Sequence, residues 1–349
     1  ELGIPSERRG TAVVGLLRGA KEGPTVALRA DIDALPVKEE VETPFRSRNE
    51  GLMHACGHDA HVAIQLGAAR LLGVMREDLA GNAKFLFQPA EEGDGGADTM
   101  VKDGCLESPR VDRVYGLHVM PDLRVGSVEL KKGALCGSSA TLSITVGGKG
   151  SHGAYPHLGT DAILIASNVV MSLNVLVSRF VSPLEEAVLS IGTIRGGTRS
   201  NIVADRVEME ATLRTTSAAV QEILIDRATS IVEGVAASFG GRGELRVKQG
   251  YAALVNHDEA VDEIEAVARS LVGEERIRWK EKPSMGVEDF SFFIAERTGA
   301  FYHLGCGNAE EGITAPLHSP LFRIDEACLP LGAAMQAGLV LSFLEKSAR

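Results

Sequence analysis

The stretch Thr25-Val26-Ala27-Leu28-Arg29-Ala30 is an apolar run that lies between a Gly-Pro pair and Asp31. A short apolar run bounded by turn residues is typical of a buried strand. Similar runs occupy residues 83–87 and 113–118, and residues 58–75 carry apolar side chains at helical spacing. Strands that alternate with helices predict an open α/β sheet.

Polar residues follow or close each of these strands. In open α/β sheets, ligands bind beyond the carboxyl ends of the strands. The residues concerned are Asp31, Asp33, Glu91, Glu92 and His118. Their shared position predicts that they contribute to one site.

The pattern changes after residue 137, where strands and helices follow in the order β-α-β-β-α-β. That order is the ferredoxin-like arrangement, which forms a self-sufficient unit. We therefore predict an α/β domain made of residues 1–137 and 253–349, interrupted by an inserted α+β domain at residues 138–252. The expected strands are 140–146, 187–194, 206–214 and 244–248, and the expected helices are 161–177 and 217–239.

Composition limits the classes of function. The 349 residues, 44% of them hydrophobic, exceed the roughly 250–300 that one core serves, which favours two domains. A net charge of -11 without a polybasic run argues against nucleic acid or anionic lipid as partner. Aromatic residues make up only 5%, which disfavours a base-stacking surface. No apolar run approaches the ~20 residues of a membrane span.

The five cysteines are odd in number and scattered, at positions 56, 105, 136, 306 and 328. That pattern is not a disulfide framework and favours a reducing cytoplasm. The first residue is Glu1 rather than Met, so a preceding segment or targeting signal stays open.

Cys56-Gly57-His58 places a thiol and an imidazole two residues apart. Thiolate, imidazole and carboxylate are the ligands that borderline divalent cations prefer. In an extended chain both side chains would lie on one side, and a glycine between them permits close approach of a metal. The alternative is a buried thiol beside a helix-capping histidine, but Glu92, His118 and His318 favour a metal centre.

Four neighbouring residues have less specific interpretations. Asp31 and Asp33 could orient a ligand histidine or a catalytic group, or could simply cap a helix or lie in a loop. His54 and His61 could also support a ligand, although we expect His61 on the surface of the helix.

Glu91-Glu92 is a pair of carboxylates placed where a strand ends. At such a turn both side chains can face one cleft, so that one binds metal while the other stays free. A free carboxylate beside a metal-bound water is a general base and then an acid towards the leaving amine. The alternative is a solvated acidic loop, because glycines follow.

A glycine-rich stretch at residues 147–157 lacks the Gly-Lys-[Ser/Thr] of a phosphate-binding loop. It carries His152, which could donate a hydrogen bond to the oxyanion of a substrate carbonyl or could be structural. Asn201 offers an amide, and Arg214 could bind a carboxylate bidentately or form an ordinary surface ion pair.

These segments, in this order, resemble the M20 metallopeptidase and amidohydrolase family, in particular its aminoacylase-like N-acyl-amino-acid amidohydrolases. That branch includes hippurate hydrolases and auxin-conjugate hydrolases. The matching segments are residues 28–36, 54–61, 89–93, 116–118, 150–157, 200–203 with Arg214, 286–290 and 317–319.

The resemblance implies a zinc-peptidase-like α/β domain with a ferredoxin-like lid that commonly mediates dimerisation. It implies two divalent ions (Zn, Mn, Co or Ni) with Glu91 as the catalytic base. The implied ligands are Cys56, His58, Glu92, His118 and His318. Asp33 matches an acid beside the metals, whereas Asp31 is not implied as a ligand. His152 matches a lid histidine that contacts the substrate carbonyl, often across the dimer, and Asn201 and Arg214 match lid residues that hold the substrate carboxylate.

We therefore expect a cytoplasmic, metal-dependent amidase that acts on small N-acyl amino acids and forms a homodimer or higher oligomer. Two alternatives remain. One is an amidase with Cys56 as nucleophile and a histidine base. The other is a non-catalytic, dimeric metal-binding module. The sequence leaves the acyl group and the metal open.

Overall fold

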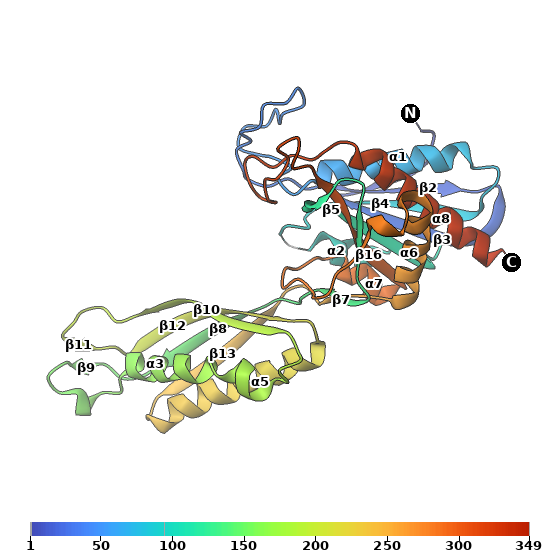
Figure 1. Cartoon of the computed structure of the whole chain (residues 1–349). Coiled ribbons are helices and arrows are strands. Elements are labelled where there is room, and N and C mark those ends of the chain that lie inside the picture. The colour runs from blue at the N-terminus through green and yellow to red at the C-terminus, as the bar shows by residue number, and fades with distance from the viewer. Residues whose placement is uncertain (1, 94, 349) are drawn as a thin grey trace. The chain divides into compact units, whose positions relative to one another are not determined.

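The computed structural model describes residues 2–93 and 95–348, which fold into two compact units (Figure 1). The first unit contains the chain up to Leu135, Val255–Lys282 and the chain from Asp289 onward. The second unit contains Cys136–Leu254 and also the short segment Pro283–Glu288, which the sequence prediction placed in the first domain.

The first unit is built on an eight-stranded sheet of order β1-β2-β4-β3-β5-β16-β6-β15. Its strands are β1 Ser6–Arg9, β2 Ala12–Arg18, β3 Lys21–Asp31, β4 Ala80–Gln88, β5 Arg113–Arg124, β6 Val128–Leu130, β15 Ile277–Trp279 and β16 Gly299–Gly307. The central strands β4, β3, β5 and β16 are parallel, so their carboxyl ends lie at one edge. The strands predicted at residues 25–30, 83–87 and 113–118 are confirmed as the cores of β3, β4 and β5.

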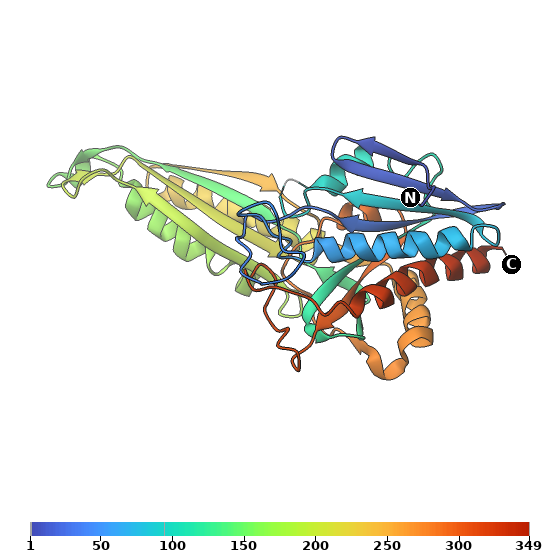
Figure 2. The same cartoon turned by 90° about the horizontal axis from the view of Figure 1, so that it is seen from above.

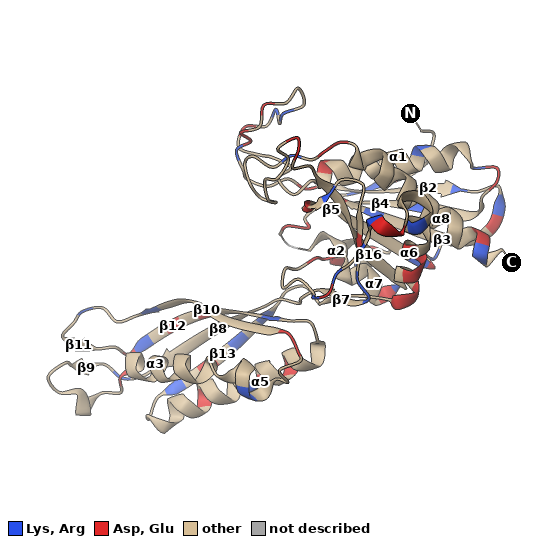
Figure 3. Cartoon of the chain, viewed as in Figure 1, with Lys and Arg blue, Asp and Glu red and all other residues tan. Residues whose placement is uncertain are grey.

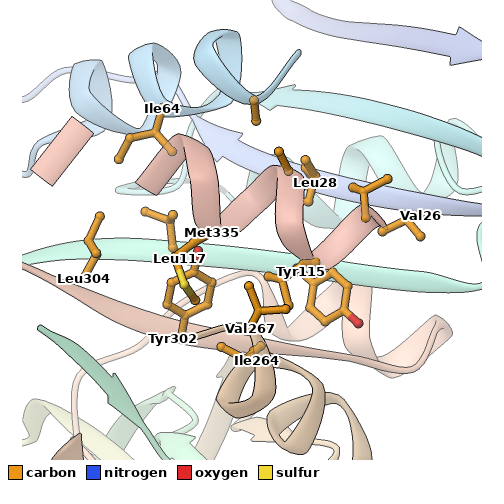
Figure 4. Packing of buried hydrophobic residues seen from close by; sticks show 14 of the residues in the cluster. Val26, Leu28, Ile64, Tyr115, Leu117, Ile264, Val267, Tyr302, Leu304 and Met335 are labelled. Atoms are coloured by element: carbon orange, nitrogen blue, oxygen red, sulfur yellow. The ribbon is translucent and has the colours of Figure 1, made fainter. Parts of the chain in front are cut away.

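Helices α1 His58–Val74 and α8 Cys328–Ser347 lie side by side on this sheet, as Figure 2 shows. The remaining helices of the unit are α2 Gly96–Lys102, α6 Asp258–Val272, the short η2 Glu274–Arg276 and α7 Ser291–Glu296. Figure 4 shows the core that the layers share, with Leu28 of β3, Leu117 of β5, Ile64 of α1 and Met335 of α8 among its buried residues. This core holds the carboxyl ends of the strands and the start of α1 in fixed positions.

Helix α8 is long and apolar enough, by length and composition, to cross a membrane, with a mean hydropathy of 1.4. This length and composition differ from the expectation that no apolar run approaches the ~20 residues of a membrane span. Half of that stretch is buried, and residues such as Met335 and Val340 pack in the core. α8 is therefore a core helix of the first unit.

The second unit has a four-stranded antiparallel sheet of order β10-β12-β8-β13, with α3 and α5 packed on one face. This is the ferredoxin-like order that the sequence predicts. Its elements are β8 Ala140–Gly147, β9 Ser151–His152, η1 Pro156–Leu158, α3 Ala162–Leu173, α4 Leu176–Phe180, β10 Ala187–Gly196, β11 Ile202–Val203, β12 Arg206–Thr215, α5 Ala218–Ser238 and β13 Arg242–Gln249. Two short strands, β7 Gly133–Cys136 and β14 Leu254–Asn256, pair with each other where the chain passes between the units.

The helix predicted at residues 161–177 is interrupted in the structure, because α3 ends at Leu173 and α4 begins at Leu176. Asp161 caps the start of α3 by accepting hydrogen bonds from the backbone N–H groups of Ile163 and Leu164.

Basic and acidic residues are interspersed along both units rather than gathered by sign (Figure 3).

Candidate metal centre

The structure brings the five expected ligands of the first unit together. Cys56 precedes α1 and His58 begins it, Glu92 follows β4, His118 lies within β5, and His318 lies in the loop before α8. The donor atoms of Cys56, His58 and His118 lie within 4.8 Å of one another, and so do those of Cys56, Glu92 and His318. The two groups share the Cys56 sulfur, which suits two neighbouring cation positions.

The turn between Cys56 and His58 requires a glycine for a reason other than the one expected. Gly57 has a φ of 80°, so this segment is not extended. A Cβ at Gly57 would lie 2.5 Å from Cγ2 of Val119. The absence of a side chain at Gly57 therefore lets the start of α1 lie close to β5, the strand that carries His118.

His318 has a left-handed backbone, with φ 65°, which costs energy for a residue with a side chain. Its backbone N–H donates to the carbonyl oxygen of Ala55 at 2.8 Å, which fixes the loop beside the thiol segment. Its Nε2 atom lies 3.0 Å from Oε1 of Glu92. The strained residue thus presents its imidazole to the other donors.

The Glu91-Glu92 pair is placed by a tight turn after β4. Ala90 has a φ of 58°, and the Asp33 carboxylate accepts hydrogen bonds from the backbone N–H groups of Glu91 and Glu92, the second at 3.0 Å. Carboxylate oxygens of both glutamates lie within 4.8 Å of an imidazole nitrogen of His58. Glu91 is buried, with 8% of its surface exposed, so a solvated acidic loop does not describe this segment.

His58 is held by Asp33, because its Nδ1–H faces the backbone oxygen and the carboxylate of Asp33 at 3.1 and 3.2 Å. Its other ring nitrogen, Nε2, lies 3.5 Å from Oδ2 of Asp31. Burial lowers the pKa of His58, but the carboxylates of Asp31 and Asp33 outweigh burial and raise that pKa to about 9. The two carboxylates therefore stabilise a positive charge on the imidazole of His58.

Two buried atoms of this group, Nε2 of His58 and Oε1 of Glu92, make no hydrogen bond of normal geometry with the described residues, although Nε2 of His318 lies 3.0 Å from that oxygen. Buried polar atoms normally have partners, and a bound cation would supply them here. His118 is prepared in the same way, because its Nδ1–H donates to the backbone oxygen of Val119 at 2.7 Å and leaves Nε2 with a lone pair. The donor set and its unpaired atoms fit divalent cations.

Cys56 lies among negative groups. Burial raises the pKa of its thiol well above the ordinary value, and the carboxylates of Glu92, Asp31 and Glu91 raise it further. Its sulfur lies 3.3 Å from Nε2 of His118. Catalytic thiolates need electropositive surroundings, so this thiol would ionise only when a cation binds beside it.

The expectation that His61 lies on the helix surface is wrong, because His61 is 2% exposed. Its Nδ1–H faces Oδ1 of Asp31 at 2.5 Å, and its Nε2 accepts from the backbone N–H of Val119 at 2.9 Å. Burial opposes ionisation of Asp31, but Arg29 and the two histidines hold the pKa of its carboxyl well below its usual range. His54 contacts the same region through its Nδ1, 3.0 Å from the backbone oxygen of Asp33.

Sequence reasoning missed Arg29 and Asp289, which are both buried beneath the site. The guanidinium of Arg29 donates to Asp31 at 2.8 Å and to Asp289 at 2.9 Å. The sequence did carry a signal for Arg29. A single cation inside an otherwise apolar strand has to pair with buried anions.

The three expected substrate-contacting residues lie in the second unit. His152 of β9 and Asn201, next to β11, lie close together, because β9 pairs with β11 and the Gly153 N–H donates to the Asn201 oxygen at 2.8 Å. Both side chains are exposed. Arg214 lies near the far end of β12, where its Nη1 donates to the backbone oxygen of Met285 at 3.4 Å.

Comparison with known proteins places the chain among hydrolases. Residues 27–342 match the family model "Peptidase family M20/M25/M40". The chain is 38% identical over 339 residues to thermostable carboxypeptidase 1 of Saccharolobus solfataricus, covering 96% of this chain and 85% of that protein. It is also 38% identical over 320 residues to N-acetyl-L-cysteine deacetylase of Bacillus subtilis, covering 91% and 74%.

Among solved structures, a dinuclear metal binding peptidase of the M20 family from Bacillus subtilis superposes with a TM-score of 0.85 at 31% identity. The match covers 99% of this chain and 89% of that one. The shared fold agrees with the predicted α/β domain and its inserted α+β domain.

Proposed function

The chain belongs to peptidase family M20/M25/M40, and from that membership we propose that it is a two-metal amidohydrolase that cleaves the acyl group from N-acyl amino acids. The chain is similar to a deacetylase of N-acetyl-L-cysteine and to a carboxypeptidase. Both names describe cleavage of an amide next to a small acid. A substrate with a free carboxylate is therefore the class that we propose.

The observation that carries the proposal is the pair Glu91 and Glu92 beside His58. Oε1 of Glu92 is a buried oxygen that lies 3.0 Å from Nε2 of His318 without a hydrogen bond of normal geometry, and both residues lie near Cys56. We propose Cys56, His58, Glu92, His118 and His318 as the residues that hold the two cations. We propose Glu91, which is buried beside His58, as the carboxylate that transfers the proton.

A divalent cation at this position would polarise the scissile carbonyl and lower the pKa of a bound water from 15.7 to about 7. The residues of the chain perform the remaining tasks. Glu91 takes a proton from the attacking water and later gives it to the leaving nitrogen, so that a carboxylate and an amine are released. Because Glu91 is buried, bulk water does not compete for the proton in either of these two transfers.

Asp33 holds the glutamate turn and His58 in fixed relative positions. Its carboxylate accepts from the backbone of the glutamate turn and from His58, which ties a proposed ligand to the proposed base. We propose Asp33 as the residue that orients them, and we propose that His152 donates to the substrate oxyanion. Asn201 and Arg214 are the proposed partners of the substrate carboxylate.

Within the second unit, His152 and Asn201 lie beyond the end of the sheet where Gly147 pairs with Arg206. Arg214 lies eight residues along β12 from Arg206, which corresponds to roughly 26 Å at 3.3 Å per residue. A small N-acyl amino acid cannot contact both ends. We therefore propose a homodimer in which a second copy supplies one of these contributions.

The surroundings of Cys56 weigh against a cysteine nucleophile, because burial and three carboxylates keep its thiol protonated. A chelator separates the two mechanisms. We expect metal removal to abolish turnover and re-addition of a single metal to restore it, whereas a thiol nucleophile would survive the chelator. All five cysteines are buried, and their positions in the sequence are scattered, which supports a proposed cytoplasmic location.

The decisive test is a panel of N-acyl amino acids and dipeptides, assayed with metal-free protein that has been reloaded with Zn, Mn, Co or Ni. We expect release of the free amino acid from at least one N-acyl substrate. Binding of metal without turnover of any amide would favour the alternative, a non-catalytic metal-binding module.

A further inference from the structure

A row of buried polar groups lies beneath the proposed metal centre, made of Asp289, Arg29, Asp31, His61 and the backbone of Val119. Each of the four side chains is at most 2% exposed. Each member is hydrogen-bonded to the next, and the last is the neighbour of His118 in sequence. We call this row the buried relay.

The relay begins with the guanidinium of Arg29, which donates in three directions. Nη2 contacts Asp289 at 2.9 Å, Nη1 contacts Asp31 at 2.8 Å, and Nε contacts Gln88 at 2.8 Å. Asp289 is itself fixed by Gln88 at 2.7 Å and by the backbone N–H of Ala97 at 3.0 Å. These contacts therefore hold the planar guanidinium of Arg29 in one orientation.

Asp31, held by Arg29, in turn fixes the orientation of the His61 ring. Because Arg29 occupies Oδ2, Oδ1 is the oxygen that faces Nδ1 of His61, at 2.5 Å. The proton therefore lies on Nδ1 of His61, and Nε2 is left to accept from the Val119 N–H at 2.9 Å. Both ring nitrogens of His61 are thereby engaged, so His61 has no lone pair left for a metal ion in this arrangement.

The relay ends at the peptide groups on either side of Val119. Its N–H donates to His61, while its carbonyl accepts the Nδ1–H of His118 at 2.7 Å. The backbone position that His61 fixes is therefore the one that fixes the ring plane of His118. That plane points Nε2 of His118 towards Cys56, 3.3 Å away.

Stability alone does not explain such a row. Buried ion pairs can often be replaced by apolar side chains without loss, because the desolvation cost offsets the attraction. Groups that fix the unligated nitrogen of a ligand histidine, or the backbone beside it, set the direction of its lone pair. On the footing of the proposed function, we propose that His61 and Arg29 are positioning residues of the metal centre that aim His118 through the buried relay.

The test measures Co²⁺ binding to the metal-free full-length protein, followed by the visible absorption of Co²⁺, which reports its coordination geometry. His61→Leu removes both hydrogen bonds, and His61→Gln can restore both. The control is Gln65→Leu, because Gln65 is buried one turn further along α1 and donates to the Leu86 oxygen at 3.0 Å, outside the relay.

We expect H61L to bind Co²⁺ about 10- to 100-fold more weakly, with an altered spectrum. H61Q should stay within about threefold of the parent protein, and Q65L should match it in affinity and spectrum. Parent-like binding by H61L, or an equal loss in Q65L, would overturn the proposal.

If H61L does not fold, Arg29→Lys takes its place, because one ammonium group cannot reproduce the three-way fork. We expect R29K to bind Co²⁺ more weakly than H61Q does, and equal affinity for R29K and the parent protein would overturn the proposal. Failure of the parent protein to bind Co²⁺ would instead refute the proposed metal centre, so the two failures are distinguishable.

Discussion

The carboxylate of Asp33 lies 3.0 Å from the backbone nitrogen of Glu92. The same carboxylate lies 3.2 Å from Nδ1 of His58. One side chain thus joins the loop after β4 to the first residue of α1. Changes at Asp33 should therefore disturb the proposed base and a proposed ligand together.

Asp33→Ala should lower metal affinity or kcat about 10- to 100-fold, because the glutamate turn and His58 both lose their shared acceptor. Metal content after gel filtration and steady-state kinetics measure the two effects. The control is Asp325→Ala, since Asp325 also accepts backbone and side-chain hydrogen bonds, from Ala327 and Asn308, but lies in the loop before α8. Equal losses in both variants would contradict the assigned role of Asp33.

Glu91→Gln should keep the metals and lower kcat about 10²- to 10⁴-fold, because an amide cannot accept the proton of the attacking water. Glu92→Gln should instead lower the metal content. Elemental analysis beside kinetics distinguishes the two. If the Glu91 variant kept most of its turnover, a different residue would have to be the base.

Gly57→Ala should destabilise the protein by on the order of 2–4 kcal/mol, through a left-handed backbone and overlap with Val119. Gly73→Ala, near the end of α1, meets no atom within 4 Å and should be neutral or slightly stabilising. Urea unfolding of both metal-free variants is the measurement. A tolerated Gly57→Ala would show that the turn can adjust.

The metal-free protein should lose stability as the pH rises from about 6.5 to about 9. The pKa of His58 is raised from 6.5 to about 9 in the folded state. A raised pKa contributes stability below the unfolded value, and that contribution disappears as the pH passes the folded value. His58→Gln should flatten this part of the pH profile of the free energy of unfolding, and an unchanged slope would argue against the assignment.

Arg214→Ala should raise KM for substrates with a free carboxylate, because a guanidinium binds such a group bidentately. Substrates with an amidated carboxyl group should show no such difference. Arg206→Ala is the matched control on the same strand, since Arg206 is paired with Glu208 at 2.7 Å. A uniform effect on both substrate types would assign Arg214 a structural role only.

The sequence predicted the elements that have a clear period. Strands β3, β4 and β5 of the first unit and the ferredoxin-like order of the second were readable, because their apolar residues alternate or run together between turn residues. Strands β1, β2, β6 and β15 were not predicted. The break between α3 and α4 was not readable, because apolar residues continue through it. The segment Pro283–Glu288 was also missed, since no local pattern records which unit a connecting segment joins.

That Cys56, His58 and His318 come together with the other donors was predictable from the combination of ligand-type residues, whereas their role as metal ligands stays a prediction. The burial of His61 was not predictable, because an imidazole at helical spacing fits a surface as well as a core. Its place depends on Asp31 and on Val119 of β5, which lie far from it in the sequence. Contacts of this kind are set by tertiary packing alone.

Four of the proposed ligands precede the second unit in the chain, and His318 follows it. A ribosome must therefore finish the whole inserted unit before the last donor leaves the exit tunnel. Nascent chains that end before His318 can offer only an incomplete set of ligands. Full-strength uptake of the ions is thereby postponed until the second unit has been synthesised.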